Sequence, residues 1–304
     1  MINSIRIGTR GSTLALAQTA WVRNKLAEQY PDIAIETIEI KTSGDRFIAA
    51  SLQAIGGKGV FTKELEEALF NREIDIAVHS MKDLPTLLPP GLTVGAIPAR
   101  EDARDVLVSG GAASLQRLSH GAKVGTGSLR RTAQVRNCRP DLLVAPIRGN
   151  VDTRLKKLDS GEYDALVIAA AGLKRIGLED RITEYLSNDV CLSAPGQGAL
   201  GLETREDDSL REQLDFLHDA TAFAEVSAER ALLRRLGGGC QVPVGAKALV
   251  DGEGLTICAV VAKPDGSRLC RGKVSGSVTE ANQLGELLAE RLLSEGAQQI
   301  LDVR

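Results

Sequence analysis

The chain has 304 residues, 43% of them hydrophobic and 25% charged, which is typical of a globular protein of about two domains. Its formal net charge is −3, and only 3% of its residues are aromatic. These values argue against a global attraction to nucleic acid or acidic membranes, and against a platform on which bases stack.

Strand-like and helix-like patterns alternate along most of the chain. Strands are predicted at residues 5–7, 33–40, 74–78, 123–124, 142–147 and 165–169. Helices are predicted from about Leu14, over residues 62–70, and from Ser128 and Asn150. The densely charged segment 100–105 lies between apolar runs and is interpreted as a crossover. Alternation at this spacing favours an α/β fold with mainly parallel sheets covered by helices.

Two stretches of the chain resemble each other. Residues 7–12 (IGTRGS) and 124–128 (VGTGS) both place a Gly-Thr turn after a strand and a serine at the start of a helix. Further along, residues 75–78 (DIAV) resemble residues 164–167 (DALV). The similarity has two interpretations: convergent strand-to-helix turns, or two similar lobes that face each other across a cleft.

The last part of the chain has a different pattern. A helix is predicted over residues 220–236, and it leads into three glycines and Cys240. Strands at 246–250 and 255–261 and a helix over 280–293 follow. This order predicts a small, separate α+β domain with a glycine loop at its entrance.

The strongest local signal is positive charge. Residues 123–154 contain seven basic and two acidic side chains, a net charge of +5 in a chain whose total is −3. Arg130 and Arg131 fall in the first turn of a helix, where a cation opposes the helix dipole unless an anion lies beside it. Arg148 stands at the end of a strand, where open α/β sheets bind ligands. Solvated surface arginines are the alternative, but the grouping favours a cleft that binds a polyanion.

Two single residues are candidates for chemistry. Asp83 follows an apolar strand directly, where a carboxylate can act as a general acid or base or stabilise a cation. An aspartate that caps the turn before Pro85 is the alternative. Cys240 follows three glycines that leave its thiol accessible, although no histidine lies nearby in sequence to activate it.

The remaining motifs are weaker. Residues 54–61 (AIGGKGVF) lack the spacing of a nucleotide-binding loop and are better interpreted as a mobile lid with a cationic lysine. The five cysteines include no CxxC pair, and the three histidines are scattered, so no metal site is expected. The absence of a leader pattern and of a membrane-spanning run, together with unpaired thiols, predicts a cytoplasmic protein with no membrane partner.

Many of these stretches together resemble the porphobilinogen deaminase (hydroxymethylbilane synthase) family of tetrapyrrole biosynthesis. The resemblance runs the whole length of the chain. It rests on RIGTRGSTLALAQ (6–18), GDR (44–46), GGKGVFTKELE (56–66), DIAVHSMKDLPT (75–86), RED (100–102), VGTGSLRR (124–131), IRGNVDTRL (147–155), AAAGLKR (169–175), PGQGALGLE (195–203) and AERALLRRLGGGCQVPVG (228–245).

The resemblance implies a role for each matching residue. Cys240 would carry a covalent dipyrromethane cofactor through a thioether, and Asp83 would be the catalytic carboxylate beside the pyrrole nitrogens. The family's cofactor-binding residues would be Lys82, Ser128, Arg130 and Arg131. The substrate-binding residues would be Arg10, Ser12, Arg148, Arg154, Arg175, Gln197 and, in the mobile loop, Lys58.

The resemblance also implies an architecture and an activity. The fold would have two periplasmic-binding-protein-like lobes around a cleft and a small α+β C-terminal domain. The lobes would span residues 1–99 with 200–217, and 100–199, and the C-terminal domain residues 218–304. The enzyme would join four porphobilinogen molecules head to tail, with loss of ammonia, into linear hydroxymethylbilane. Its partners would be porphobilinogen and the growing oligopyrrole, and it would be a monomer.

Two positions depart from the family pattern. Gly127 stands where serine is more frequent, and Ala103 where proline is frequent. A two-lobed, non-catalytic binding protein is the main competing interpretation, and a phosphate-binding transferase that uses residues 56–59 (GGKG) is a second. Cys240 and Asp83 argue against the first, and the glycine spacing argues against the second.

Overall fold

The structure is a computed structural model that describes residues 4–43, 62–237 and 243–302. Lys58 and Cys240, and the GDR motif at 44–46, lie outside the described residues. The chain divides into two compact units: Met1–Arg100 with Ala199–Ala222, and Glu101–Gly198 with Phe223–Arg304. No helix in the described ranges combines the length and apolar character needed to cross a membrane.

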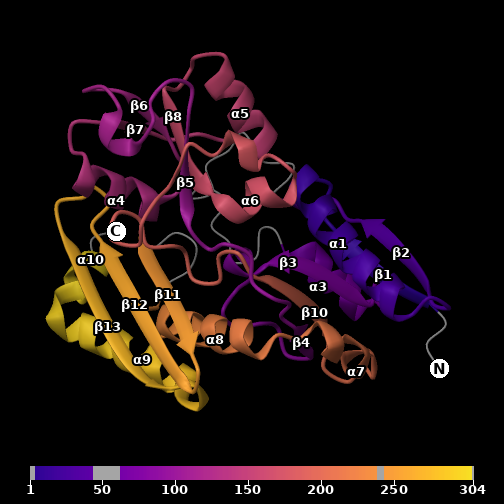
Figure 1. Cartoon of the computed structure of the whole chain (residues 1–304). Coiled ribbons are helices and arrows are strands. Elements are labelled where there is room, and N and C mark those ends of the chain that lie inside the picture. Colours follow the sequence, from indigo (N-terminus) through magenta and orange to yellow (C-terminus); the bar gives the residue numbers. More distant parts are fainter. Residues whose placement is uncertain (1–3, 44–61, 238–242, 303–304) are drawn as a thin grey trace. The chain divides into compact units, whose positions relative to one another are not determined.

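The first unit is built on a five-stranded mixed sheet (Figure 1). The strand order is β2-β1-β3-β10-β4, in which β1 is parallel to β2 and β3, while β10 runs antiparallel to β3 and β4. Apolar clusters form on two sides, one including Val22 and Leu26 of α1, the other Leu65 and Leu69 of α3. The elements are β1 (Ser4–Thr9), α1 (Thr13–Gln29), β2 (Ala34–Glu39), α3 (Lys63–Phe70), β3 (Ile76–Ser80), β4 (Leu92–Ala96), β10 (Leu200–Arg205) and α7 (Leu210–Leu214).

The second unit contains a sheet of the same design, with strand order β7-β6-β8-β5-β9. Here β6 is parallel to β7 and β8, while β5 runs antiparallel to β8 and β9. Two apolar clusters again contain residues of these strands. The elements are β5 (Asp105–Ser109), β6 (Lys123–Gly125), α4 (Leu129–Cys138), β7 (Leu143–Ala145), α5 (Val151–Asp159), β8 (Ala165–Ala169), α6 (Ala170–Arg175) and β9 (Glu184–Tyr185).

The two sheets repeat one local contact. The Asp75 carboxylate accepts the Arg6 backbone N–H at 2.9 Å, and the Asp164 carboxylate accepts the Lys123 backbone N–H at 2.7 Å. The strand register after the two aspartates is also the same, because Gly8 pairs with Ala77 and Gly125 with Leu166. The sequence similarity therefore reflects two similar lobes rather than convergent turns alone.

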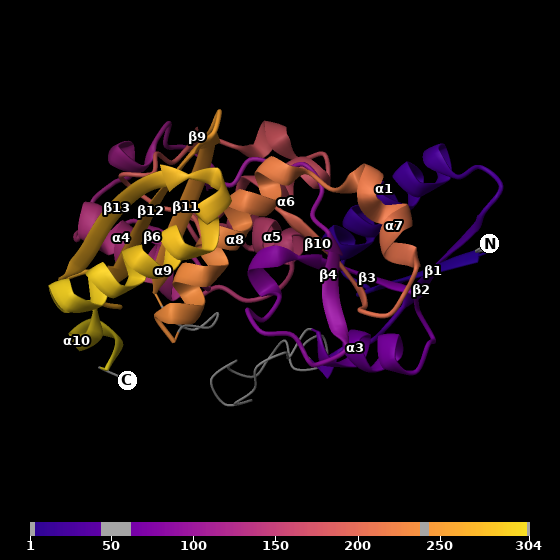
Figure 2. The same cartoon turned by 90° about the horizontal axis from the view of Figure 1, so that it is seen from below.

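The C-terminal part is a three-stranded antiparallel sheet with helices on one face (Figures 1 and 2). Leu232 of α8 and Leu284, Leu288 and Leu292 of α9 share one buried cluster with the strands. The elements are α8 (Ala220–Arg235), β11 (Val244–Asp251), β12 (Gly254–Ala262), β13 (Leu269–Ser277), α9 (Ala281–Leu292) and α10 (Gln298–Leu301).

The expected fold class, an α/β protein with two sheet-based lobes and a small α+β C-terminal part, is confirmed. The three-domain division remains a prediction. The sequence did not predict β4, β5, β9, β10 and β13, and the charged segment interpreted as a crossover ends in the first residue of β5. β13 escaped prediction because its LCRGKVSGS sequence exposes every second residue and carries little apolar pattern.

We expect the replacement of Asp75 and of Asp164, the equivalent aspartates of the two sheets, to cause unequal losses of stability. Asp75 binds the guanidiniums of Arg6 at 2.8 Å and Arg205 at 3.2 Å in addition to the backbone, and these contacts outweigh burial and lower its pKa. We expect D75N to lower the free energy of unfolding by about 1.5–3 kcal/mol, and D164N by about 0.5–1.5 kcal/mol. Urea denaturation of the two variants measures this, and equal losses would contradict it.

Candidate functional site

In the first unit, four predicted site residues lie at one edge of the sheet. Arg10 and Ser12 follow β1, while Lys82 and Asp83 lie in a short 3-10 helix, Met81–Asp83, that follows β3. Since β1 and β3 are parallel, their carboxyl ends meet at the same edge. Arg10, Ser12 and Asp83 line one pocket of about 70 Å³, together with Gln18, His79 and Ser80.

The local sequence explains how these groups are held. Ser12 begins α1, because its hydroxyl accepts the Ala15 N–H at 3.2 Å. Gln18 of the same helix donates to the Ser80 hydroxyl at 2.9 Å and so ties α1 to the end of β3. Asp83 is exposed and Lys82 is half-buried. The pocket therefore combines a guanidinium, a hydroxyl and a solvent-accessible carboxylate.

Sequence reasoning missed a buried pair in the lining of this pocket. His79 is one of the three scattered histidines at which no metal site is expected, and its Nε2 lies 2.8 Å from a carboxylate oxygen of Glu203 on β10. Glu203 is fully buried, and its other carboxylate oxygen has no hydrogen-bond partner among the described residues. A partner 124 positions away along the chain leaves no local sequence signal.

In the second unit, the arginine pair is buried around one carboxylate. Arg130 and Arg131 are only 4% and 6% exposed, and Asp105 at the start of β5 is fully buried. Asp105 lies 2.6 Å from Nη1 of Arg130 and 2.7 Å from Nη2 of Arg131. Ser128 begins α4 by accepting the Arg131 N–H at 3.4 Å. The anion that the sequence analysis required beside these arginines is therefore supplied, in part, by the chain itself.

Neighbouring polar groups complete this arginine cluster, defined as Asp105, Arg130, Arg131, Cys191 and Gln197. The side-chain carbonyl of Gln197 accepts from Arg131 at 3.2 Å, and its amide donates to Asp105 at 2.8 Å. The backbone carbonyl of Leu192 accepts from Arg130 at 2.6 Å. Gln197, predicted to bind substrate, is thus 1% exposed and bonded inside the cluster.

The electrostatics of the arginine cluster leave a positive charge. Burial alone would raise the pKa of the Asp105 carboxyl, but Arg130 and Arg131 outweigh it and hold the pKa well below its usual range. Burial raises the pKa of the Cys191 thiol to about 12, so this group stays neutral. Two guanidiniums and one carboxylate sum to +1 near neutral pH. A net buried charge favours a further anion at the same place.

The other predicted arginines follow the strands at the same edge of the second sheet. Arg148 follows β7 and is exposed, and Arg154 of α5 donates from Nε to the Gly149 carbonyl at 2.8 Å. Arg175 ends α6 after β8 and donates to the Gly198 carbonyl at 2.6 Å. Burial lowers the pKa of Arg175 to about 10, which leaves it charged at neutral pH.

Another buried carboxylate, Glu229 of α8, also escaped sequence reasoning. It is fully buried and accepts the backbone N–H of Gly196 at 2.7 Å and that of Ala248 at 2.8 Å. Gly196 belongs to the loop 194–198 that carries Gln197. The burial of Asp105 had an available sequence signal, because its charge stands directly next to the apolar run of β5. A glutamate within a helical pattern, by contrast, does not reveal burial.

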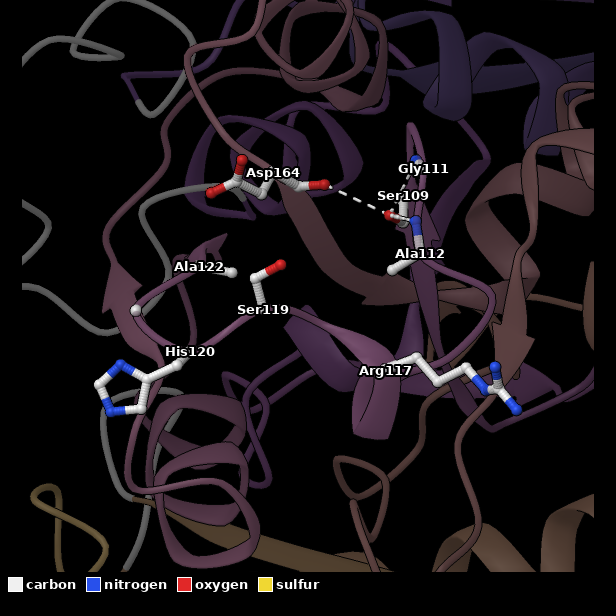
Figure 3. Close-up of a pocket in the computed structure, with 9 residues that line it drawn as sticks. Ser109, Gly111, Ala112, Arg117, Ser119, His120, Ala122 and Asp164 are labelled. Atoms are coloured by element: carbon white, nitrogen blue, oxygen red, sulfur yellow. Dashed lines mark hydrogen bonds between the residues drawn. The ribbon is translucent and has the colours of Figure 1, made fainter.

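A pocket of about 490 Å³ lies elsewhere in the second unit (Figure 3). Ser109 ends β5, Ala122 precedes β6 and Asp164 precedes β8, which places the pocket at the amino ends of β6 and β8. The predicted arginines follow the opposite ends. In Figure 3, Arg117 and His120 extend away from each other rather than toward one point. The pocket therefore brings together none of the predicted residues.

The family models and the relatives that match the sequence of this chain bear the same name. A family model described as "Porphobilinogen deaminase, dipyromethane cofactor binding domain" matches residues 5–213, and one described as its C-terminal domain matches residues 223–294. Porphobilinogen deaminase of Desulforudis audaxviator is 53% identical over 99% of this chain and 98% of its own. That of Geobacter sulfurreducens is 51% identical over 99% of this chain and 94% of its own.

Among solved structures, the periplasmic aliphatic sulphonate binding protein SsuA of Escherichia coli is 16% identical, with a TM-score of 0.40 over 77% of this chain and 70% of its own. The periplasmic VFT2 domain of Bordetella pertussis BvgS is 15% identical, with a TM-score of 0.43 over 70% and 86%. The sequence matches span nearly the whole chain at about half identity. The chain therefore belongs to the porphobilinogen deaminase family, whose members are transferases with a dipyrromethane cofactor.

Proposed function

We propose that the chain joins four porphobilinogen molecules head to tail, with loss of ammonia, and releases linear hydroxymethylbilane. The observation that carries this proposal is that each sheet has one kind of site at its carboxyl edge. One is a pocket with an accessible carboxylate, Asp83, beside Arg10 and Ser12. The other is a group of arginines with an uncompensated positive charge. The cytoplasmic location and the monomeric state remain predictions.

The described residues fit a dipyrromethane with acidic side chains. The arginine cluster has a net charge of +1, and Arg148, Arg154 and Arg175 add cations at the same sheet edge. Guanidinium groups bind carboxylates through paired hydrogen bonds. Helix α8 ends at Arg235, five residues before Cys240, the proposed attachment point. When bound, the dipyrromethane supplies the pyrrole on which the chain starts to grow.

Asp83 would do the chemical work at the reacting end. Loss of ammonia from porphobilinogen leaves a cation that extends over the pyrrole nitrogen. In its acid form, an accessible carboxyl group can donate a proton to the leaving amine, and the carboxylate that remains can stabilise this cation. Arg10, Ser12 and Lys82 lie at the same sheet edge and can bind the acetate and propionate groups of the substrate. Each added pyrrole brings two carboxylates, which accounts for the number of arginines.

The intact mass of the purified chain tests the proposal most directly. We expect the wild-type mass to exceed the sequence mass by that of one dipyrromethane, and C240S to lack this addition because serine offers no thiolate. C258S is the matched control, since Cys258 is a free cysteine in β12, outside the arginine cluster, and its replacement should leave the adduct in place. A wild-type chain with no added mass that binds porphobilinogen reversibly would instead support the two-lobed binding protein.

Replacing Asp83 separates chemistry from folding. We expect D83N to lower kcat by about 10²–10⁴, the range for loss of a general acid or base, because the amide can neither donate a proton nor carry the charge. The thermal unfolding midpoint should change little, since Asp83 is exposed. D32N is the control, because Asp32 is also exposed but precedes β2 at the opposite edge of the sheet. A near-normal rate in D83N would remove Asp83 from the mechanism.

Asp105 predicts a dependence of stability on pH. Its folded-state pKa is depressed, so its stabilising contribution is complete above the unfolded-state pKa of about 4 and is lost as the pH falls below it. We expect D105N to be less stable by about 3–5 kcal/mol at pH 7, the cost of leaving buried charges unpaired. The difference from the wild type should shrink between pH 5 and pH 3. Guanidinium denaturation across this range measures it, and a constant difference would contradict the assignment.

A further inference from the structure

The position of Glu229 connects two parts of the second unit that are distant in sequence. One carboxylate oxygen accepts the N–H of Gly196 in the loop 194–198, and the other accepts the N–H of Ala248 in β11. Because Glu229 is fully buried, water cannot replace either hydrogen bond without a rearrangement. The carboxylate therefore fixes the loop 194–198 to helix α8 and to the C-terminal sheet.

The loop is in turn bonded to the arginine cluster. Gln197, next to Gly196, accepts from Arg131 and donates to Asp105 and to the Ala103 carbonyl, the last at 2.7 Å. On its other side, Gly198 adopts a φ of +87°, and a Cβ atom there would collide with the Glu101 carbonyl. The loop thus has one closely packed conformation, and its placement sets the side chain of Gln197.

We propose that Glu229 is a positioning residue that holds the arginine cluster in register with the helix leading to Cys240. The inference rests on the proposed function, in which the arginine cluster binds the carboxylates of a group attached to that cysteine. A path of hydrogen bonds and adjacent residues runs from Glu229 of α8 through Gly196 and Gln197 to Arg131 and Asp105. A shift of α8 would displace Gly196 and, through Gln197, the arginine cluster with it.

The path requires a carboxylate rather than an amide. Glutamate offers two acceptor oxygens to two N–H donors, whereas glutamine offers one oxygen and turns an NH₂ group toward the other N–H. E229Q should therefore release either the loop or β11 while changing the side-chain volume very little.

Glu225 provides a matched control one helical turn earlier. It lies on the same face of α8, is also buried, and bonds to Lys247 at 2.7 Å and to the Val250 N–H at 3.4 Å. Both of these contacts are on β11. E225Q therefore weakens the attachment of the helix to the sheet without acting on the Gly196 N–H, which separates a general loss of stability from a loss of positioning.

The first experiment measures loading of the unmodified chain. Wild-type, E229Q and E225Q chains are made in cells without porphobilinogen and incubated with it, and intact mass follows the appearance of the adduct. We expect E229Q to load more slowly by about tenfold or more, the factor for a lost hydrogen bond to a charged group, and E225Q to load within about twofold of the wild type. Equal slowing in both variants would mean a structural role only and would overturn the proposal.

A second measurement needs no Glu229 variant and applies even where E229Q does not fold. Binding coupling between two sites is reciprocal, so if the positioned loop and arginine cluster bind the carboxylates of the attached group, that bound group stabilises the loop in turn. We expect the amides of Gly196 and Gln197 to exchange hydrogen about tenfold more slowly in the loaded wild type than in C240S. Unchanged exchange at these amides would overturn the proposal. A wild-type chain that never loads would instead contradict the proposed function itself.

Discussion

In the second unit, two guanidiniums share the one buried carboxylate of Asp105, and the rest of the site depends on this contact. Burying Arg130 and Arg131 without an anion would cost several kcal/mol for each charge, and Asp105 offsets much of this cost at 2.6 and 2.7 Å. The start of β5, the first turn of α4 and the loop 194–198 must all meet at this point. Local constraints therefore accumulate here, including the serine cap of α4 and the positive φ of Gly198.

The two lobes show how one scaffold receives different chemistry. Counting eight residues from the equivalent aspartates, Asp75 leads to Asp83 in the first lobe, and Asp164 leads to Gly172 in the second. The first lobe thus has an accessible carboxylate where the second has a buried glycine within α6. Conversely, the second lobe has the buried arginine cluster, and the first has the His79–Glu203 pair. Backbone similarity positions the residues, and side-chain identity assigns their roles.

The sequence predicted what local patterns determine. β8 and α8 were found to within one residue, and Ser12 and Ser128 begin their helices as the motifs indicated. Strand β5 was missed because its first residue, Asp105, ends the charged segment interpreted as a crossover, and β10 because the strands it pairs with come from a distant stretch of chain. The partners of the candidate residues were missed for the same reason, since Asp105 binds Arg130 across 25 positions and Glu229 binds Gly196 across 33.

The arginine cluster keeps a positive charge although it contains the carboxylate of Asp105, so this carboxylate is compatible with the proposed binding of an acidic ligand. If the chain supplied two carboxylates for its two arginines, the cluster would be neutral and would have little attraction for an acidic ligand. With only Asp105, and with Cys191 kept protonated by burial, one positive charge remains uncompensated inside the cluster. Asp105 lowers the cost of burying the two guanidiniums, and the positive charge that remains can attract the acidic ligand of the proposed function. Their orientation is set before any ligand arrives, which lowers the entropic cost of binding.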